Sequence, residues 1–131
     1  MKYEEIYNNS EAHAALLNLR RPSPKGKKFL YFGKFSAYFC GYAMFSGVQS
    51  ALGVTSEIEA ATGRKFFPKA NFTVGDMAGF LSQNRKKYDL IVVNEPMQPP
   101  HMYKRCLPEL MALLEPEGLL ACRLVMCPCH E

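Results

Sequence analysis

The chain has 131 residues, a mass of 14.8 kDa and a formal net charge of +4, with 48% hydrophobic and 21% charged residues. This length suits one domain with its own core, and the composition excludes wholesale disorder and a collagen-like or low-complexity chain. Charged or polar residues interrupt every apolar run before it reaches about 18 residues, so no membrane-spanning helix is expected. The mild basic excess is compatible with a nucleic acid or another anionic partner.

The cysteines and the N-terminus bear on the compartment. The cysteines are five in number: Cys40, Cys106, Cys122, Cys127 and Cys129. Three of the five lie in apolar patterns that are typical of buried thiols. A secreted disulfide framework is therefore not expected. Residues 1–5 include two acidic residues, Glu4 and Glu5, and they lack the apolar stretch of a signal peptide. We expect an intracellular protein of the cytoplasm or of an organelle matrix, with no membrane partner.

Three segments follow from composition along the chain. Residues 1–28 are predicted to hold a short helix, capped by Ser10 and ending near Leu19, and then a basic linker that prolines interrupt. Residues 29–126 form the main domain. Residues 127–131 form a Cys-rich tail.

Within the main domain, strands and helices alternate. Short apolar runs predict strands at 29–32, 51–54, 71–74, 88–93 and 119–125. Helices are expected at 36–50, 57–62, 76–84 and 101–114, and residues 115–118 are a predicted turn. Gly63 is expected to stop the second helix, and Pro108 to kink the fourth or delay its start. Aromatic residues of the first helix, at positions 38, 39, 42 and 45, are expected in the core, with an exposed stacking surface as the alternative.

This alternation predicts an α/β fold in three layers, with a parallel sheet and right-handed crossovers. The β-branched run at 88–93 indicates a strand that is buried on both faces, as in the middle of such a sheet. Ligands of such sheets bind beyond the carboxyl ends of the strands. We therefore expect a site in the loops that begin at Gly33, Thr55, Gly75 and Asn94.

Four segments resemble class I S-adenosylmethionine-dependent methyltransferases. They are YDLIVVNEP at 88–96, LPELMALLEPEGLL at 107–120, GVQSALGVTS at 47–56 and VGDMAGFL at 74–81. The similarity covers most of the chain, from about Phe29 to Val125. It implies a Rossmann-like sheet of about five parallel strands in the order 3-2-1-4-5, without the last two strands of the family. A flavodoxin-like order is the alternative that the pattern leaves open.

The chain departs from the family where the cofactor binds. The family's first motif, D-x-G-x-G-x-G, covers residues 31–37, and only Gly33 matches a motif glycine. Tyr31 stands at the acidic position, and Phe35 stands at the middle glycine, where its ring is expected to fill the space of the cofactor. Thr55 stands at the position where the family has an acidic residue that binds both ribose hydroxyls of the cofactor. Glu57, two residues later, is the candidate substitute.

The resemblance also assigns candidate site residues. Asp76 matches the position that binds the adenine amino group, and Asn94 begins a loop similar to the one that holds a target amine. The candidates are thus Gly33, Glu57 and Asp76 for the cofactor and Asn94 for catalysis. The structural alternatives are a tight turn at Gly33, a helix cap at Asp76 and a structural loop at Asn94 and Glu95.

Two classes of function follow from the resemblance. The first is a non-catalytic methyltransferase-like module that binds no cofactor and serves as a subunit of a larger protein or ribonucleoprotein assembly. The second is an active S-adenosylmethionine-dependent methyltransferase, acting on RNA. An apolar sheet edge at 119–126 predicts another chain or a second copy as its cover, with the N-terminal segment as the alternative.

Two further patterns concern charge and metal. Basic clusters occur at 20–21, 25–28, 64–69, 85–87 and 104–105, and the first clusters and the one at 85–87 precede strands. They predict a basic rim opposite the crevice, suited to RNA phosphates, to an acidic protein or to solvent alone. Cys127, Cys129 and His130 could hold a metal only with a fourth ligand from Cys122, His101 or another chain. Their short spacing on a terminal tail favours a tail without metal, so no metal site is expected.

Overall fold

The structure is a computed structural model that describes residues 25–94 and 100–122, without the side chains of 100–105 and 122. The predicted N-terminal helix, most of the basic linker and the Cys-rich tail lie outside the described residues. Within them, no helix is long and apolar enough to cross a membrane.

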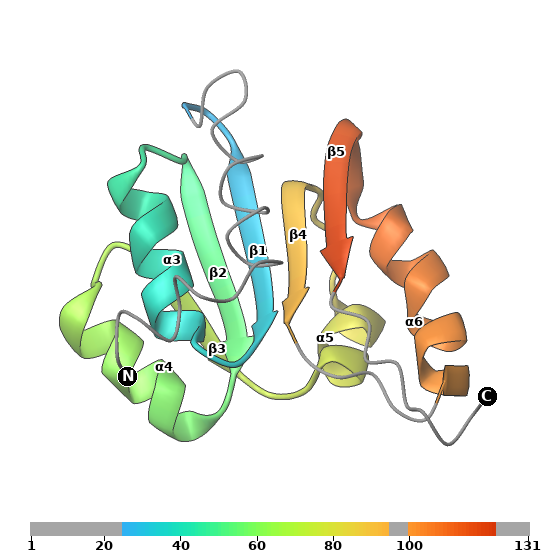
Figure 1. The fold of residues 1–131 in the computed structure, drawn as a ribbon, viewed down its shortest axis with the longest axis horizontal. Coiled ribbons are helices and arrows are strands. Elements are labelled where there is room, and N and C mark those ends of the chain that lie inside the picture. The colour runs from blue at the N-terminus through green and yellow to red at the C-terminus, as the bar shows by residue number, and fades with distance from the viewer. Residues whose placement is uncertain (1–24, 95–99, 123–131) are drawn as a thin grey trace, which may run out of the picture.

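Five parallel strands form one sheet in the order β3-β2-β1-β4-β5 (Figure 1). Their bounds are β1 Lys28–Gly33, β2 Ser50–Thr55, β3 Asn71–Val74, β4 Tyr88–Asn94 and β5 Leu114–Cys122. The predicted order 3-2-1-4-5 is confirmed, and the flavodoxin-like alternative is excluded. The order reverses between β1 and β4, where Gly33 pairs with Asn94 at the carboxyl ends of the two strands.

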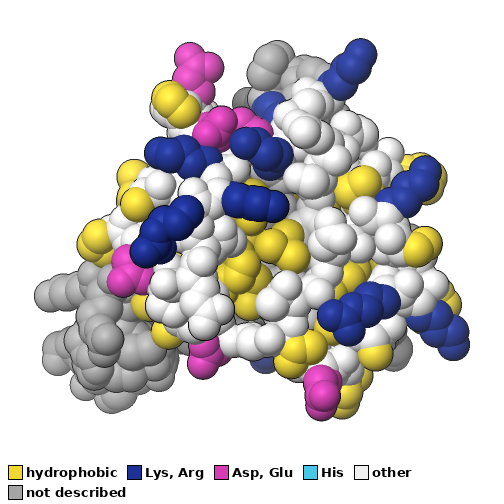
Figure 2. All heavy atoms as spheres, turned by 180° about the vertical axis from the view of Figure 1, so that it is seen from behind, with side chains coloured by type: hydrophobic (Ala, Val, Ile, Leu, Met, Phe, Trp, Pro, Cys, Tyr) yellow, Lys and Arg dark blue, Asp and Glu magenta, His cyan; other side chains and the backbone are white. Residues whose placement is uncertain are grey.

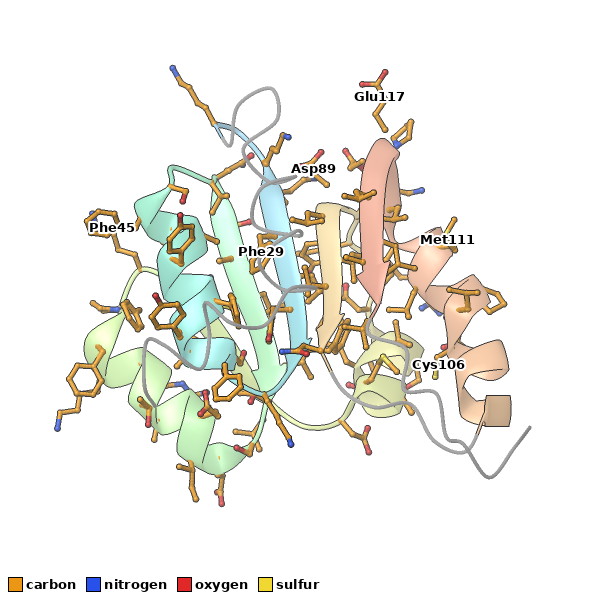
Figure 3. The ribbon with its side chains drawn as sticks, in the orientation of Figure 1. Phe29, Phe45, Asp89, Cys106, Met111 and Glu117 are labelled. Atoms are coloured by element: carbon orange, nitrogen blue, oxygen red, sulfur yellow. The ribbon has the colours of Figure 1, made fainter. Side chains whose placement is uncertain are left out.

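Four helices connect the strands, and each face of the sheet carries two of them (Figure 1). Their bounds are α3 Ser36–Phe45, α4 Glu57–Phe66, α5 Met77–Gln83 and α6 Pro100–Ala112. Alternate residues of β1 supply both cores, because successive strand side chains point to opposite faces. Phe29 and Tyr31 pack on the side of α3 (Figure 3), whereas Leu30 and Phe32 pack on the side of α5 and α6.

The prediction that Gly63 stops the second helix is wrong, since α4 continues to Phe66. Gly63 instead lies against the ring of Phe72 in β3, and a Cβ at this position would overlap that ring. The glycine therefore serves close packing of a helix on a strand. The tertiary contact, rather than the local propensity of glycine, decides the length of the helix.

Three other expectations need correction. The first helix ends at Phe45 rather than near residue 50, and the Phe45 side chain is 94% exposed, so the core role predicted for it is wrong. Pro108 lies inside α6, so the helix does not start late. The predicted separate turn at residues 115–118 is wrong. These residues belong to β5, and the pairing of β5 with β4 shifts its register there, between Tyr88 and Leu90.

Candidate functional site

A cavity of about 420 Å³ opens at the carboxyl ends of β1, β2 and β3, next to the point where the strand order reverses. Two predicted cofactor residues line it, Gly33 and Asp76, and Phe35 and Thr55 line it as well. The full lining is Gly33, Lys34, Phe35, Thr55, Ser56, Glu59, Gly75 and Asp76. The structure thus brings together residues from three predicted loops at the position where ligands bind such sheets.

The loop between β1 and α3 makes a tight turn at this cavity. Gly33 has a φ of 114°, and Phe35 has a φ of 61°, the left-handed conformation that a residue with a Cβ adopts at a cost of about 1–2 kcal/mol. Phe35 precedes α3 as its N-cap and makes no side-chain capping bond. Phe35 is half-buried, its side chain packs against the core under α3, and the residue lines the cavity. A phenylalanine therefore occupies a backbone position that suits glycine.

Tyr31, at the family's acidic position, ties this loop to β4. Its hydroxyl donates to the carbonyl of Lys34 at 2.6 Å and accepts a hydrogen bond from the Asn94 Nδ2 at 2.8 Å. The Tyr31 ring is buried and stacks on Phe39, with ring centroids 5.2 Å apart. The tyrosine hydroxyl thus connects the first loop to the end of β4.

Asn94, the catalytic candidate, is 3% exposed and does not line the cavity at Gly33 and Asp76. Its Nδ2 is used by Tyr31, and its Oδ1 accepts no hydrogen bond from the described residues. This geometry fits the structural alternative for Asn94, because a buried amide with a donor already engaged holds the β1–β4 junction together.

The first turn of α4, after the second loop, contains a cavity-lining carboxylate that the sequence did not predict. Glu57, the candidate ribose ligand, lies exposed in the first turn of α4 and does not line the cavity. Glu59 lines it instead, and its Oε1 accepts a hydrogen bond from the Ala37 N–H of α3 at 3.2 Å. A carboxylate is favourable near the N-terminus of a helix. The spacing of Ser56 and Glu59, a capping box, was the available signal.

Thr55 is buried, and its hydroxyl lies 3.4 Å from the Gly33 carbonyl, to which it donates. Asp76 caps α5, because its Oδ1 accepts a hydrogen bond from the Gly79 N–H at 2.7 Å. Asp76 also lines a second, neighbouring cavity of about 540 Å³ between β3 and α5. Capping uses one carboxylate oxygen, so the other oxygen can accept a bond from a ligand.

The described residues contain no group of His, Cys, Asp and Glu side chains that could hold a metal ion. The tail residues Cys127, Cys129 and His130 lie outside the described part of the chain, so the prediction about them stays a prediction.

No protein-family model matches the sequence, and no curated protein matches it either. Many solved structures are similar. A TehB-like S-adenosylmethionine-dependent methyltransferase from Corynebacterium glutamicum has 24% identity and a TM-score of 0.64, over 86% of this chain and 60% of that one. The chain has the class I methyltransferase fold. CalS10 from Micromonospora echinaspora, an amino pentose methyltransferase bound to S-adenosylmethionine, has 18% identity and a TM-score of 0.71, over 96% of this chain and 57% of that one.

A ribosomal protein L11 methylase from Lactobacillus delbrueckii has 20% identity and a TM-score of 0.64, over 86% of this chain and 59% of that one. The chain thus spans about three fifths of the length of these methyltransferases. The predicted resemblance is confirmed for the fold. The cavity at Gly33 and Asp76 lies at the carboxyl ends of β1, β2 and β3. The assignment of cofactor-binding residues to it stays a prediction.

Proposed function

We propose that this chain is a methyltransferase-fold module with a degenerate cofactor crevice, and that it serves as a non-catalytic structural or binding subunit of a larger protein or ribonucleoprotein assembly. The observation that carries the proposal is the position of Phe35, a non-glycine residue in left-handed conformation that lines the crevice. In the family, a bare glycine at this position lets the cofactor approach the backbone.

Two further groups of the crevice do not fit S-adenosylmethionine. The Glu59 carboxylate already accepts the Ala37 N–H at the start of α3, and a bound methionine carboxylate would meet this like charge. Thr55 cannot replace a carboxylate as acceptor for both ribose hydroxyls. The loss of one charge-assisted bond costs about 1.5–3 kcal/mol, which raises a dissociation constant about ten- to a hundred-fold.

A calorimetric titration tests this proposal. The purified protein is titrated with S-adenosylmethionine and with S-adenosylhomocysteine, and its melting temperature is followed at the same concentrations. We expect neither heat nor a melting shift at micromolar ligand. The double variant Phe35→Gly/Glu59→Gln, which removes the ring and the like charge, is expected to bind better than the unaltered chain.

One result would support the alternative, an active methyltransferase acting on RNA. Micromolar binding that Asp76→Ala abolishes and Asp76→Asn weakens would contradict the degenerate crevice. The cavity of about 420 Å³ and the place of Asp76 in its wall favour this alternative. In that case Asp76 would hold the adenine and Gly33 would approach the methionine carboxylate. Methyl transfer to an RNA substrate would then be assayed directly.

A partner at the β5 edge is part of the proposal. Among the described residues, β5 is the end of the sheet and pairs with β4 alone, and Leu119 is 41% exposed. An unpaired strand edge is a template for pairing with another chain. Residues 123–126 of the predicted edge lie outside the described residues. Sedimentation velocity at increasing concentration tests a second copy as the partner, since self-pairing predicts a concentration-dependent dimer that Leu119→Lys dissociates.

A further inference from the structure

Two large aromatic side chains are exposed at the ends of neighbouring helices. Phe45, the last residue of α3, is 94% exposed and points outward (Figure 3), and Phe66, the last residue of α4, is 63% exposed. α3 leads to the start of β2 and α4 leads to the start of β3, so both rings lie toward the end of the sheet where the strands begin. This end is called the amino edge below. Large apolar side chains that are exposed together mark interaction sites.

Both rings border one cavity of about 340 Å³. This volume lies near the lower end of the roughly 300–1,000 Å³ of ligand pockets. Only one of the eight described lining residues, a lysine, has a polar side chain: Gly41, Met44, Phe45, Phe66, Phe67, Pro68, Lys69 and Ala70. The cavity therefore suits apolar side chains, because the polar edges of a nucleobase would find few side-chain hydrogen-bond partners in it.

The floor of the cavity is held by close packing and by backbone hydrogen bonds. The Phe67 ring lies against Gly41 of α3, where a Cβ would overlap the ring. The Phe67 N–H donates to the Gly63 carbonyl at 2.7 Å, and the Ala70 N–H donates to the Phe67 carbonyl at 3.0 Å. These bonds fix the turn from α4 to β3, which forms one wall. A pre-formed cavity requires little ordering when a ligand binds.

The charge around the cavity has one sign. Lys69 lines the cavity, and the Lys65 ammonium lies 5.4 Å from the centre of the Phe66 ring. Residues 36–56 contain no charged side chain, and residues 60–75 contain basic residues and no acidic residue. The acidic residues of α4 lie in its first turn, at the opposite end of that helix. The apolar cavity thus has a positively charged rim.

The basic residues on the opposite face of the sheet differ in this respect. The clusters at 25–28 and 85–87 lie at the starts of β1 and β4, as predicted. On that face, seen in Figure 2, acidic side chains lie next to basic ones toward the amino edge. The Lys28 ammonium lies 3.6 Å from the Glu115 carboxylate of β5. Within the described part of the chain, the two lysines at the cavity form no such ion pair.

We propose that this surface docks a segment of a partner protein, which inserts bulky apolar side chains between Phe45 and Phe66. Carboxylates of the same segment lie opposite Lys65 and Lys69. The apolar lining selects a protein segment over RNA, and the positive rim selects acidic residues beside the inserted side chains. A symmetric contact with a second copy would instead bring the same lysines of both copies together.

This inference rests on the proposed function, which requires a partner, and it names the chemistry of that partner. The surface adjoins β2 and β3, whereas β5 forms the other end of the sheet. It therefore adds a second docking site to the one proposed at the β5 edge.

Fluorescence anisotropy with a labelled peptide tests this surface in the full chain. The probe is an amphipathic peptide of about 16 residues, long enough to form a helix, with Leu on one face and Glu on the other. One control peptide has the same composition in scrambled order, without an apolar face. The other has Lys in place of Glu. We expect saturable binding of the Leu/Glu peptide alone, and we expect this binding to weaken as salt is added.

Phe45→Ser tests the apolar contact. We expect at least about a five-fold loss of affinity for the Leu/Glu peptide, because buried aromatic side chains carry much of the energy of an interface. Ile58→Ser is the matched control, since Ile58 is 80% exposed in the first turn of α4 and does not line the cavity. Circular dichroism verifies the fold of each variant.

Lys69→Gln tests the charged rim. We expect weaker binding at low salt and little change at high salt, because salt screens the interaction between exposed charges. Lys34→Gln is the matched control, because it removes the same charge at the crevice and is expected to leave peptide binding unchanged. Equal effects of the two substitutions would overturn the role of the rim.

Several results would overturn the proposal. They are no binding of the Leu/Glu peptide at low salt, equal binding of either control peptide, and no effect of Phe45→Ser. Competition by an oligouridylate as strong as that by unlabelled Leu/Glu peptide would assign the surface to RNA. A concentration-dependent dimer in sedimentation velocity that Phe45→Ser dissociates would assign it to a second copy.

The chain itself contains a segment of the same chemistry, Tyr-Glu-Glu-Ile-Tyr at 3–7, outside the described residues. An increase in peptide affinity on Ile6→Ser would assign the surface to this segment and overturn a partner protein. The outcome is separable from that of the proposed function. Binding of S-adenosylmethionine with normal peptide binding would contradict the degenerate crevice alone, whereas the absence of both would contradict the docking surface alone.

Discussion

Tyr31 and Asn94, 63 residues apart in sequence, are joined by a 2.8 Å hydrogen bond from the asparagine Nδ2 to the tyrosine hydroxyl. The same hydroxyl donates to the Lys34 carbonyl at 2.6 Å. This pair connects the ends of β1 and β4, where the strand order reverses and where a ligand would enter such a sheet. The chain thus uses its own side chains to hold together the junction at which the crevice opens.

Removal of the Tyr31 hydroxyl should destabilise the protein. In Tyr31→Phe the ring still stacks on Phe39, but the buried Asn94 amide loses its partner, which costs about 1–3 kcal/mol. Urea unfolding measures the loss. Tyr88→Phe is the control, because the Tyr88 hydroxyl accepts a longer hydrogen bond, 3.4 Å from Asn84 Nδ2. An effect of Tyr31→Phe no larger than that of Tyr88→Phe would contradict the role of the junction.

The left-handed backbone at Phe35 can be separated from the packing of its ring. Phe35→Ala and Phe35→Gly both remove the ring, but only glycine adopts a φ of 61° without steric cost. We expect the glycine variant to be more stable than the alanine variant by about 1 kcal/mol, from thermal or urea unfolding. At an ordinary helical position alanine is more stabilising than glycine. An alanine variant that is as stable as the glycine variant, or more stable, would therefore contradict a strained backbone at residue 35.

Substitutions of Asp76 distinguish helix capping from ligand binding. Asp76→Ala should lower the free energy of unfolding by about 0.5–2 kcal/mol, because α5 loses the bond to the Gly79 N–H. Asp76→Asn should keep most of that stability, since asparagine is an equally good cap. Both are measured by denaturant unfolding without ligand. A large loss in the asparagine variant would show that the negative charge itself stabilises the fold.

Cys40 should be unreactive in the folded protein. It is fully buried, and this burial raises its pKa from 9.0 to about 12. Iodoacetamide at pH 8, followed by peptide mapping, should leave Cys40 unmodified until the chain unfolds. Modification as fast as in the denatured chain would contradict the buried site.

The same shift makes stability depend on pH. The unfolded thiol ionises near pH 9 and the folded thiol only near pH 12, so its contribution is complete below pH 9 and falls as the pH rises from 9 to 12. Unfolding curves of the unaltered chain and of Cys40→Ala across this range isolate the contribution. Parallel losses in both proteins would show that other groups cause the pH dependence.

The alternation of apolar runs with helical segments determined the α/β class and the five strands, because burial on two faces leaves a continuous apolar pattern that local sequence records. The terminal positions of α4 and β5 were not determined in this way. Gly63 continues a helix because Phe72 packs against it. Residues 115–118 belong to a strand because the residues on either side of them, Leu114 and Leu119, pair with β4. Both depend on neighbours that are distant in sequence.

The crevice shows the same division. The sequence by itself placed Gly33, Phe35 and Asp76 at one site, since the carboxyl ends of parallel strands meet at one edge. Only the tertiary structure shows that Glu59 rather than Glu57 lines the crevice, that Asn94 is buried against Tyr31 and that Phe45 is exposed. Side-chain direction depends on how helices pack against the sheet, and no local pattern encodes that packing.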